Sequence, residues 1–138
     1  MTEVIVVVGS RDYMYPELVR RYVEHLPPNV LVVSRGIRGV DRQVQTLCEN
    51  RGIHVACIKA LWENYGKSAD NKRNHYMAVL ADKVVAFWDG ESAGTLRCLE
   101  KADELGKPCF VIHGPKPVMI PWGRNAGTHH AEDRHPPA

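Results

Sequence analysis

The sequence predicts an α/β fold, with an open parallel sheet of about five strands and helices on both faces. Three observations predict it. Short apolar runs alternate with segments of helical periodicity, and the connections between them are short. The apolar runs are rich in β-branched residues. The first run, 4–8, contains no polar residue, which is typical of a strand buried on both faces of a parallel sheet.

Local sequence signals mark where the expected helices begin and end. Pro16 begins the first helix, because proline is favoured at the first helical position, and Pro27 and Pro28 end it. Gly52 and Gly106 follow the second and fourth helices, as C-terminal glycines do. The segment 59–68 is expected to be a polar and aromatic loop. The expected strands are 4–8, 30–33, 55–58, 84–87 and 108–112, and the expected helices are 16–26, 41–52, 70–80 and 95–105.

Length and composition indicate one soluble domain. Hydrophobic residues make up 44% of the 138 residues and charged residues 25%, which excludes intrinsic disorder of the main body. We expect one domain over 1–120, with a small extra edge strand at 118–120, and a flexible tail over 121–138. His129, His130 and His135 of this tail could bind a metal, but they lack a rigid frame. We therefore expect no metal and no cofactor.

Other features favour a cytoplasmic protein with no membrane partner. No apolar run approaches the ~20 residues that cross a bilayer, and the first run begins too early for a signal peptide with a basic leader. Cys48, Cys57, Cys98 and Cys109 lack zinc-site spacing and are expected to be buried, small apolar residues. The net charge of +2 is too small to indicate nucleic-acid binding through bulk charge.

Four unusual loops follow the first four expected strands, and in an open parallel sheet such loops meet at one edge, where ligands bind. Glycines let the backbone approach a ligand, and Gly39 and Gly94 open helices, whose N-termini favour anions. Arginines supply forked donors for phosphate, and Trp88 or Trp62 could stack on a base. These loops predict a site for a phosphorylated ligand. The expected ligand-binding residues are Gly9, Ser10, Arg11, Arg35, Gly36, Arg38, Gly39, Asp41, Arg73, Asn74, Trp88, Asp89, Gly90, Ser92, Gly94 and Thr95.

Each of these residues also has a structural interpretation. Taken singly, Asp41 and Thr95 are better explained as helix caps. Trp62 and Trp88 could be core or subunit-interface aromatics, and Arg38 could lie on a solvated face. The coincidence of four such loops at one edge favours a ligand site over these separate explanations.

Five segments, in this order and spacing, carry a resemblance that covers about residues 3–112: 7–12, 36–41, 72–77, 81–82 and 86–95. They resemble the SLOG superfamily and, more narrowly, its YspA-like branch of small bacterial and phage proteins. The resemblance implies a Rossmann-like fold that binds nucleotides or nucleotide-derived ligands, and dimers are common in the superfamily. Its members include the Lonely Guy phosphoribohydrolases, which cleave the base–ribose bond, and a DNA-processing protein that loads recombinase on single strands. Many YspA-like members have no assigned reaction.

The chain departs from this pattern at two positions. Arg35 stands where the branch usually has the first of two glycines, and it could fill part of the pocket, add a phosphate ligand or weaken binding. The Lonely Guy enzymes carry a glutamate where this chain has Cys98, whereas their catalytic arginine matches Arg73. This chain therefore has the matching arginine but lacks the matching glutamate. In an enzyme, Asp89 or Glu91 would have to supply a carboxylate beside Arg73.

We therefore expect a protein that binds a nucleotide or nucleotide-derived phosphorylated ligand at the carboxyl edge of the sheet, as a sensor or sequestering module rather than an enzyme. One alternative is phosphoribohydrolase-like cleavage of the N-glycosidic bond of nucleoside monophosphates. Another is binding of single-stranded DNA, which the modest net charge disfavours. A homodimer or higher homo-oligomer is expected, with Trp62, Tyr65, Tyr76 and Met77 as candidates for its apolar face.

Overall fold

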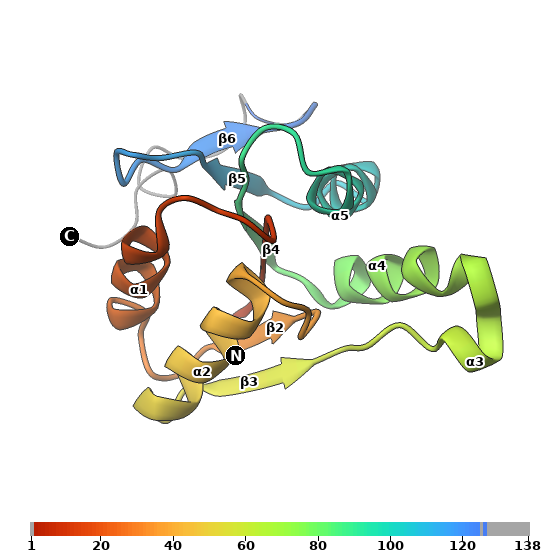
Figure 1. The fold of residues 1–138 in the computed structure, drawn as a ribbon, viewed down its shortest axis with the longest axis horizontal. Coiled ribbons are helices and arrows are strands. Elements are labelled where there is room, and N and C mark those ends of the chain that lie inside the picture. The colour runs from red at the N-terminus through yellow and green to blue at the C-terminus, as the bar shows by residue number, and fades with distance from the viewer. Residues whose placement is uncertain (1, 125, 127–138) are drawn as a thin grey trace.

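The described part of the chain, residues 2–124 and 126, folds around one six-stranded sheet in the computed structural model (Figure 1). The strand order is β3-β2-β1-β4-β5-β6, and all neighbours pair in parallel except β5 and β6. The α/β, Rossmann-like fold class is confirmed. The strands are β1 (Val4–Gly9), β2 (Leu31–Ser34), β3 (His54–Cys57), β4 (Lys83–Phe87), β5 (Cys109–Ile112) and β6 (Ile120–Trp122).

Helices cover both faces of this sheet (Figure 1). α1 and α2 cover one face and α4 and α5 the other, so the apolar core has two halves. Alternate residues of β1 enter opposite halves: Ile5 and Val7 pack against α1 and α2, and Val6 and Val8 pack against α4 and α5. The helical segments are α1 (Pro16–Glu24), α2 (Val40–Arg51), α3 (Trp62–Tyr65), the 3-10 turn η1 (Gly66–Ser68), α4 (Ala69–Leu80) and α5 (Ala93–Glu104).

The helix ends follow the sequence signals at several places. Pro16 occupies the start of α1, and Gly52 ends α2 in the left-handed conformation, with a φ of 72°. α1 ends at Glu24, two residues before the expected end, although Leu26 is still buried in the core. Among the described residues, no helix has the length and apolar character needed to cross a membrane.

Two segments differ from expectation. The expected loop 59–68 contains α3 and η1, whose short turns bury none of their side chains. The extra edge strand is β6, at 120–122 rather than 118–120, because it pairs antiparallel with β5 up to Trp122. The sheet therefore continues two residues beyond the expected domain end at 120. Most of the expected tail, including its three histidines, lies outside the described residues.

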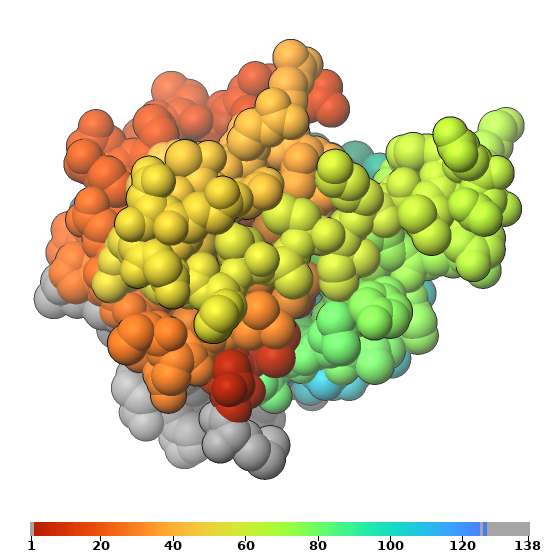
Figure 2. Space-filling model, turned by 90° about the horizontal axis from the view of Figure 1, so that it is seen from below, coloured from red at the N-terminus to blue at the C-terminus, as the bar shows by residue number. Residues whose placement is uncertain are grey.

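The topology places the carboxyl ends of the parallel strands β1 to β5 at one edge of the sheet. The strand order reverses between β1 and β4, since the chain first builds β2 and β3 on one side of β1 and then β4 and β5 on the other. Such a reversal opens a crevice between the loops that follow the two strands. In the space-filling view, α3 and the start of α4 (yellow-green) project from the side of the molecule beside this edge (Figure 2).

Candidate functional site

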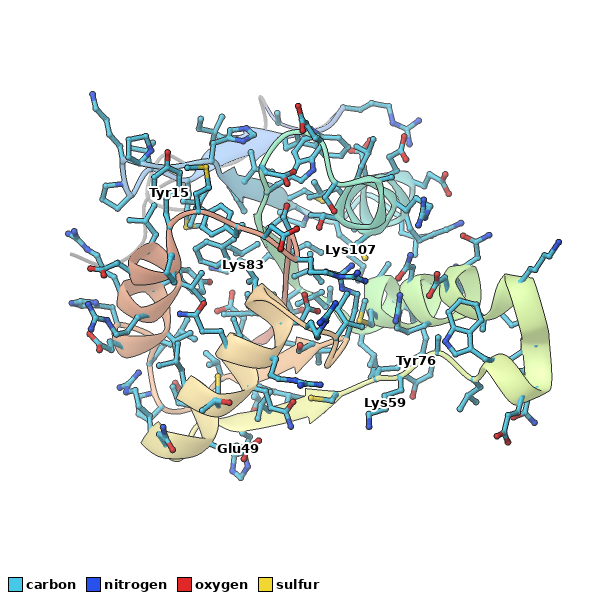
Figure 3. The ribbon with its side chains drawn as sticks, viewed as in Figure 1. Tyr15, Glu49, Lys59, Tyr76, Lys83 and Lys107 are labelled. Atoms are coloured by element: carbon cyan, nitrogen blue, oxygen red, sulfur yellow. The ribbon has the colours of Figure 1, made fainter. Side chains whose placement is uncertain are left out.

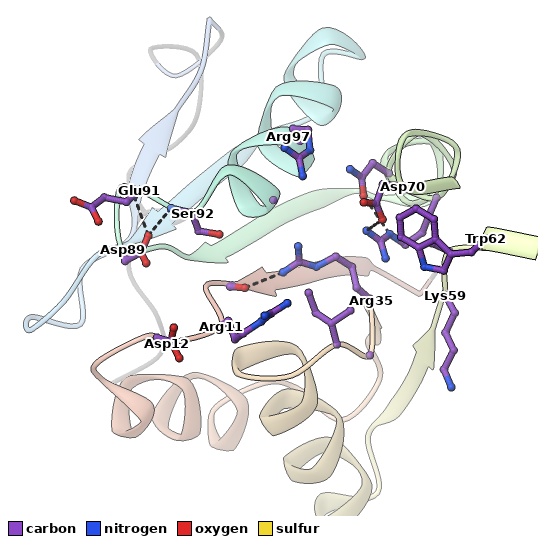
Figure 4. Close-up of a pocket in the computed structure, with 17 residues that line it drawn as sticks. Arg11, Asp12, Arg35, Lys59, Trp62, Asp70, Asp89, Glu91, Ser92 and Arg97 are labelled. Atoms are coloured by element: carbon purple, nitrogen blue, oxygen red, sulfur yellow. Dashed lines mark hydrogen bonds and ion pairs between the residues drawn. The ribbon is translucent and has the colours of Figure 1, made fainter. Parts of the chain in front are cut away.

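A cleft of about 790 Å³ lies at the carboxyl ends of β1, β2, β3 and β4 (Figure 4). All four loops that the sequence singled out contribute to it. The expected binding or catalytic residues that line it are Gly9, Arg11, Arg35, Gly36, Arg73, Asn74, Asp89, Glu91, Ser92 and Gly94. Sequence reasoning did not assign ligand-binding roles to the other lining residues, Asp12, Ile37, Lys59, Ala60, Asp70 and Arg97. Trp62, which it did consider as a stacking residue, also lines the cleft.

The remaining expected residues do not line the cleft. Ser10, Asp41 and Thr95 are buried beneath it, where they hold the loops in place. Trp88 is half-buried against the core, and its indole N–H donates to the Ser92 carbonyl over 3.1 Å. The others that lie outside the lining are Arg38, Gly39 and Gly90.

We call the buried lining and supporting residues Gly9, Arg35, Asp41 and Asn74 the floor of the cleft. Its central feature is an ion pair between Arg35, 3% exposed, and Asp41, fully buried. The Arg35 Nη2 and Nε atoms lie 2.7 and 2.8 Å from the two Asp41 carboxylate oxygens, and Nη2 also donates to the Gly9 carbonyl over 2.8 Å. This fork-to-fork geometry is the strongest that an arginine and a carboxylate form.

Asp41 is not a helix cap, contrary to the interpretation favoured from sequence. Its carboxylate accepts the backbone N–H groups of Gly9 and Arg35 and lies 3.4 Å from the Ser34 hydroxyl. Burial alone would lower the pKa of Arg35, but the hydrogen bonds and charge of Asp41 raise that pKa above its usual value. Arg35 therefore stays charged, and its contacts with Asp41 join the ends of β1 and β2 to the start of α2.

Two expected ligand-binding glycines are required by packing. A Cβ atom on Gly9 would lie 2.5 Å from the Cβ of Val40, so β1 and α2 could not approach as they do. Gly39 has a φ of +88°, and a Cβ there would collide with the backbone of Arg11. Both glycines let the loops after β1 and β2 pack together below the cleft.

Arg73, the residue matched to the catalytic arginine of the Lonely Guy enzymes, lies on α4 and lines the cleft. Its guanidinium pairs with Asp70 over 2.9 Å and donates from Nε to the Asn74 amide oxygen over 3.2 Å. The same amide oxygen accepts the Cys98 thiol over 3.3 Å. Burial raises the pKa of Cys98, and the nearby charge of Arg35 only partly opposes this effect. The thiol is therefore neutral at the position where the Lonely Guy enzymes carry a glutamate.

The loop after β4 is ordered by its own carboxylate. The Asp89 carboxylate accepts hydrogen bonds from the backbone N–H groups of Glu91 and Ser92, each over 2.8 Å. The backbone N–H of Asp89 donates to the Ser10 hydroxyl. Burial would raise the pKa of Asp89, but these hydrogen bonds together lower it. Ser92 then caps α5 by accepting the Thr95 N–H over 3.5 Å. The cap is therefore Ser92, not Thr95.

We call the exposed lining residues Arg11, Lys59, Trp62, Glu91 and Arg97 the rim of the cleft. Among the described residues, none of the three cationic side chains on the rim, Arg11, Lys59 and Arg97, has an ion-pair partner. The Trp62 side chain is 56% exposed. Arg97 could have been found from sequence, because a helix brings positions three apart to the same face and Gly94 was already assigned to the site.

A smaller apolar groove of about 320 Å³ adjoins the cleft and shares Lys59 and Arg73 with it. It lies between the end of β3 and the helices α3 and α4, where Figure 3 shows Lys59 and Tyr76. Its other lining residues are Ile58, Leu61, Tyr65, Ala69 and Lys72. Among residues 2–124 and 126, no cluster of three or more His, Cys, Asp or Glu side chains could hold a metal ion.

Two solved structures are similar to this chain. DNA processing protein A (DprA) from Streptococcus pneumoniae superposes with a TM-score of 0.70 and 21% sequence identity, over 82% of this chain and 51% of that one. The structural genomics target TM1055 superposes with a TM-score of 0.59 and 25% identity, over 78% of this chain and 72% of that one. The chain has the Rossmann-like fold of the SLOG superfamily.

The chain spans about half the length of DprA. No protein-family model and no curated protein sequence matches it. The superposed structures support the superfamily that the sequence resembles, and they leave the YspA-like branch as a prediction.

Proposed function

We propose that this SLOG protein binds a nucleotide or nucleotide-derived phosphorylated ligand in the cleft, as a sensor or sequestering module. One observation carries the proposal. The buried arginines of the cleft already have carboxylate partners, whereas Arg11, Lys59 and Arg97 line it without any among the described residues. Three unpaired cations around a cleft next to a helix N-terminus favour an anionic ligand. The exposed ring of Trp62 offers a surface for a base.

The same geometry favours binding over hydrolysis of an N-glycosidic bond. Such hydrolysis needs a carboxylate that stabilises the ribosyl cation or activates water. Cys98 is neutral, and the Asp89 carboxylate is engaged by two backbone N–H groups. The Asp70 carboxylate is paired with Arg73. Glu91 and Asp12 are the lining carboxylates that remain without an ion pair among the described residues, and both are exposed.

The first experiment is a thermal-shift screen with nucleotides, nucleoside diphosphate sugars and cyclic dinucleotides, followed by calorimetric titration of the ligands that shift the midpoint. A ligand at a hundred times its dissociation constant should stabilise the fold by about 2.7 kcal/mol. Chromatography of the same samples should show no free base. Release of free base would instead support the phosphoribohydrolase alternative, with Glu91 as the residue to mutate next.

Arg11→Ala and Arg38→Ala form a matched pair for this screen. Both arginines are exposed and follow neighbouring strands, but only Arg11 lines the cleft. Arg11→Ala should weaken ligand binding by about three- to tenfold, the value of one charge-assisted contact at an exposed site. Arg38→Ala should bind as the wild type does. Equal losses in both variants would point to general charge attraction rather than to the cleft.

We also propose that this chain is cytoplasmic and a homodimer of the YspA-like branch. Four large side chains on α3, α4 and the preceding loop, Leu61, Trp62, Tyr65 and Tyr76, are exposed and could pair with a second copy. Met77 does not belong to this face, because it is buried in the core. Light scattering tests the dimer. Salt-dependent binding of oligonucleotides in the same preparation would favour the single-stranded DNA alternative.

A further inference from the structure

The two edges of the sheet differ in whether a further strand can be added to them. β6 forms one edge and contains Pro121, which has no backbone N–H to donate to a neighbouring strand. β3 forms the other edge, contains no proline and is the outermost strand on its side of the sheet in Figure 1. Prolines on edge strands prevent pairing with another chain. Only the edge at β6 is protected in this way.

The backbone groups of β3 that point away from the sheet follow from its pairing with β2. The Ile58 N–H donates to the Ser34 carbonyl over 2.8 Å, so the backbone of Ile58 faces β2. Successive residues of a strand turn their N–H and C=O groups to opposite sides, so Val55 and Cys57 present theirs to the outside. Among the described residues, no strand pairs with this outer side. β3 therefore offers two N–H and two C=O groups to a further strand.

The smaller apolar groove continues this open edge. Ile58 directly follows β3 and lines the groove, together with the exposed side chains of Leu61, Tyr65 and Tyr76. The Ile58 side chain packs against the half of the core that α4 and α5 cover, so the groove lies on that face of the sheet. In an added strand every second side chain would face the same way. A strand that pairs with β3 and continues past Cys57 would therefore place an apolar side chain in the groove.

The charged side chains that line this groove are all cationic. They are Lys59, Lys72 and Arg73, and among the described residues no carboxylate lines it. Asp70 pairs with Arg73, whereas Lys59 and Lys72 have no ion-pair partner in the described part of the chain. A segment with acidic side chains would complement these two charges.

A second copy of this chain complements the groove less well. A two-fold axis would pair two β3 strands antiparallel, which brings the residues just before one strand alongside the residues just after the other. The residues before β3 are Arg51, Gly52 and Ile53, and Lys59 lies after it. The second copy would therefore bring a cation and no carboxylate toward Lys59.

We infer that the outer edge of β3 binds an extended acidic segment of a partner protein, which pairs with β3 as a further strand and fills the groove with an apolar side chain. Hydrogen bonds with Val55 and Cys57 provide affinity, and the groove with its lysines selects the sequence. The inference does not depend on the ligand of the cleft. The segment would cover Leu61, Tyr65 and Tyr76, so it would compete with the second copy proposed above for that face.

The test begins with a library of short random peptides displayed on phage and selected on the full chain. The enriched peptides should alternate apolar residues with others that include carboxylates. Each is synthesised and titrated by calorimetry at a chain concentration where light scattering shows a monomer. Two further versions carry backbone N-methyl groups, one at the odd and one at the even residues. Only the version that loses the N–H groups facing β3 should bind about tenfold more weakly, the value of one to two hydrogen bonds.

Amide hydrogen exchange, followed by NMR, identifies the edge that binds. In the free chain, the outward N–H groups of Val55 and Cys57 should exchange faster than those of Ala56 and Ile58, which face β2. A peptide at about ten times its dissociation constant should slow exchange at Val55 and Cys57 about tenfold, because about a tenth of the chains remain free. Exchange at Ala56 and Ile58 should change less.

Two matched pairs of exposed residues test the groove without disturbing the core. Tyr76 and Val79 lie on α4 and are 57% and 55% exposed, but only Tyr76 lines the groove. Tyr76→Ala should weaken binding of the selected peptides about tenfold, and Val79→Ala should leave it unchanged. Lys72→Glu should weaken binding about three- to tenfold. Lys67→Glu, on η1 and outside the groove, should bind as the wild type does.

Three outcomes overturn the inference, and none of them bears on nucleotide binding in the cleft. If no enriched peptide binds in calorimetry, the edge accepts no partner segment. If both N-methylated versions bind alike and exchange at Val55 and Cys57 is unchanged, the groove takes apolar side chains without strand pairing. If these two N–H groups are protected in the concentrated chain alone and lose protection on dilution, a second copy occupies the edge.

Discussion

On the floor of the cleft, the Arg35 side chain is 3% exposed and donates three hydrogen bonds, whereas on the rim Arg11 and Arg97 are exposed and have no ion-pair partner among the described residues. Both regions are rich in arginine, yet their energetics differ. The floor charges lose their water and pair with each other when the chain folds. Their desolvation cost and their mutual attraction therefore both contribute to the free energy of unfolding. The rim charges are still hydrated, so their interactions remain available to a ligand.

This difference teaches that residue type alone does not separate structural from ligand-binding arginines. Arg35 lies at the boundary between the two regions, because one side of its guanidinium belongs to the floor and the other faces the cleft. Substitutions on the floor should therefore change mainly the free energy of unfolding, and substitutions on the rim mainly ligand affinity.

The largest effect should follow from Asp41→Ala, which leaves the Arg35 charge buried without its partner. Removing one member of a buried ion pair typically costs about 3–5 kcal/mol of unfolding free energy. Urea unfolding followed by circular dichroism measures this loss. Asp70→Ala is the matched control, because the Asp70 side chain in the pair with Arg73 is 33% exposed, so its removal should cost less than that of Asp41. Equal losses in the two variants would show that full burial of the Arg35–Asp41 pair adds nothing to the cost of breaking it.

Gly9→Ala should have the next largest effect. Its Cβ would meet the Val40 side chain at 2.5 Å, so β1 and α2 must separate, and overpacking of this kind costs about 1–3 kcal/mol. Gly94→Ala is the control on the opposite side of the cleft, where the added Cβ meets no close neighbour. Urea unfolding of both variants should show a loss only for Gly9→Ala. A stable Gly9→Ala variant would mean that Gly9 is kept for ligand approach, as the sequence alone suggested.

The fold could be predicted from sequence because its signals are local. A β-branched run such as 4–8 has only one stable environment, a strand covered on both faces, and Pro16 and Gly52 mark helix ends by their own backbone preferences. The α3 turn was missed for the same reason: a four-residue helix that buries none of its side chains leaves no hydrophobic period. β6 forms by pairing with β5, which local sequence signals do not specify. The expected strand 118–120 therefore differs from the observed strand 120–122.

The edge that holds the cleft was also predictable, because topology alone brings the loops after β1 to β4 together. The roles within it were not. Nothing local distinguishes Asp41, which turns toward Gly9 and Arg35, from an ordinary first-turn cap. The local sequence also does not reveal that Arg97 has no ion-pair partner among the described residues, although the Asp70–Arg73 pair has a spacing of three that a helix brings to one face. The contact of Asp41 with Gly9 joins residues 32 positions apart, which only the folded chain brings together.

A smaller effect is expected at Ser92, where the floor meets the rim at the start of α5. Ser92→Ala removes the side-chain acceptor of the Thr95 N–H and should cost about 1 kcal/mol, as the loss of a helix cap does. Ser68 precedes α4 in the equivalent position but makes no capping bond with its side chain, so Ser68→Ala is the matched control and should cost less. Urea unfolding compares the two. A larger loss at Ser68 would show that the long Ser92 contact contributes little.

The smallest effect concerns Asp89, an exposed carboxylate that orders the loop after β4. Its pKa is lowered in the folded protein, because the hydrogen bonds from Ser92, Glu91 and Ser10 outweigh the opposite effect of burial. A carboxylate with a lowered folded pKa stabilises the fold above its unfolded pKa, and this contribution disappears as the pH falls through the folded value. Asp89→Asn should therefore be less stable than the wild type at pH 7, and the difference should shrink between about pH 5 and pH 2. Urea unfolding across this range measures it. Since asparagine can still accept both N–H groups, a difference that stays constant with pH would assign the role of Asp89 to loop geometry and not to its charge.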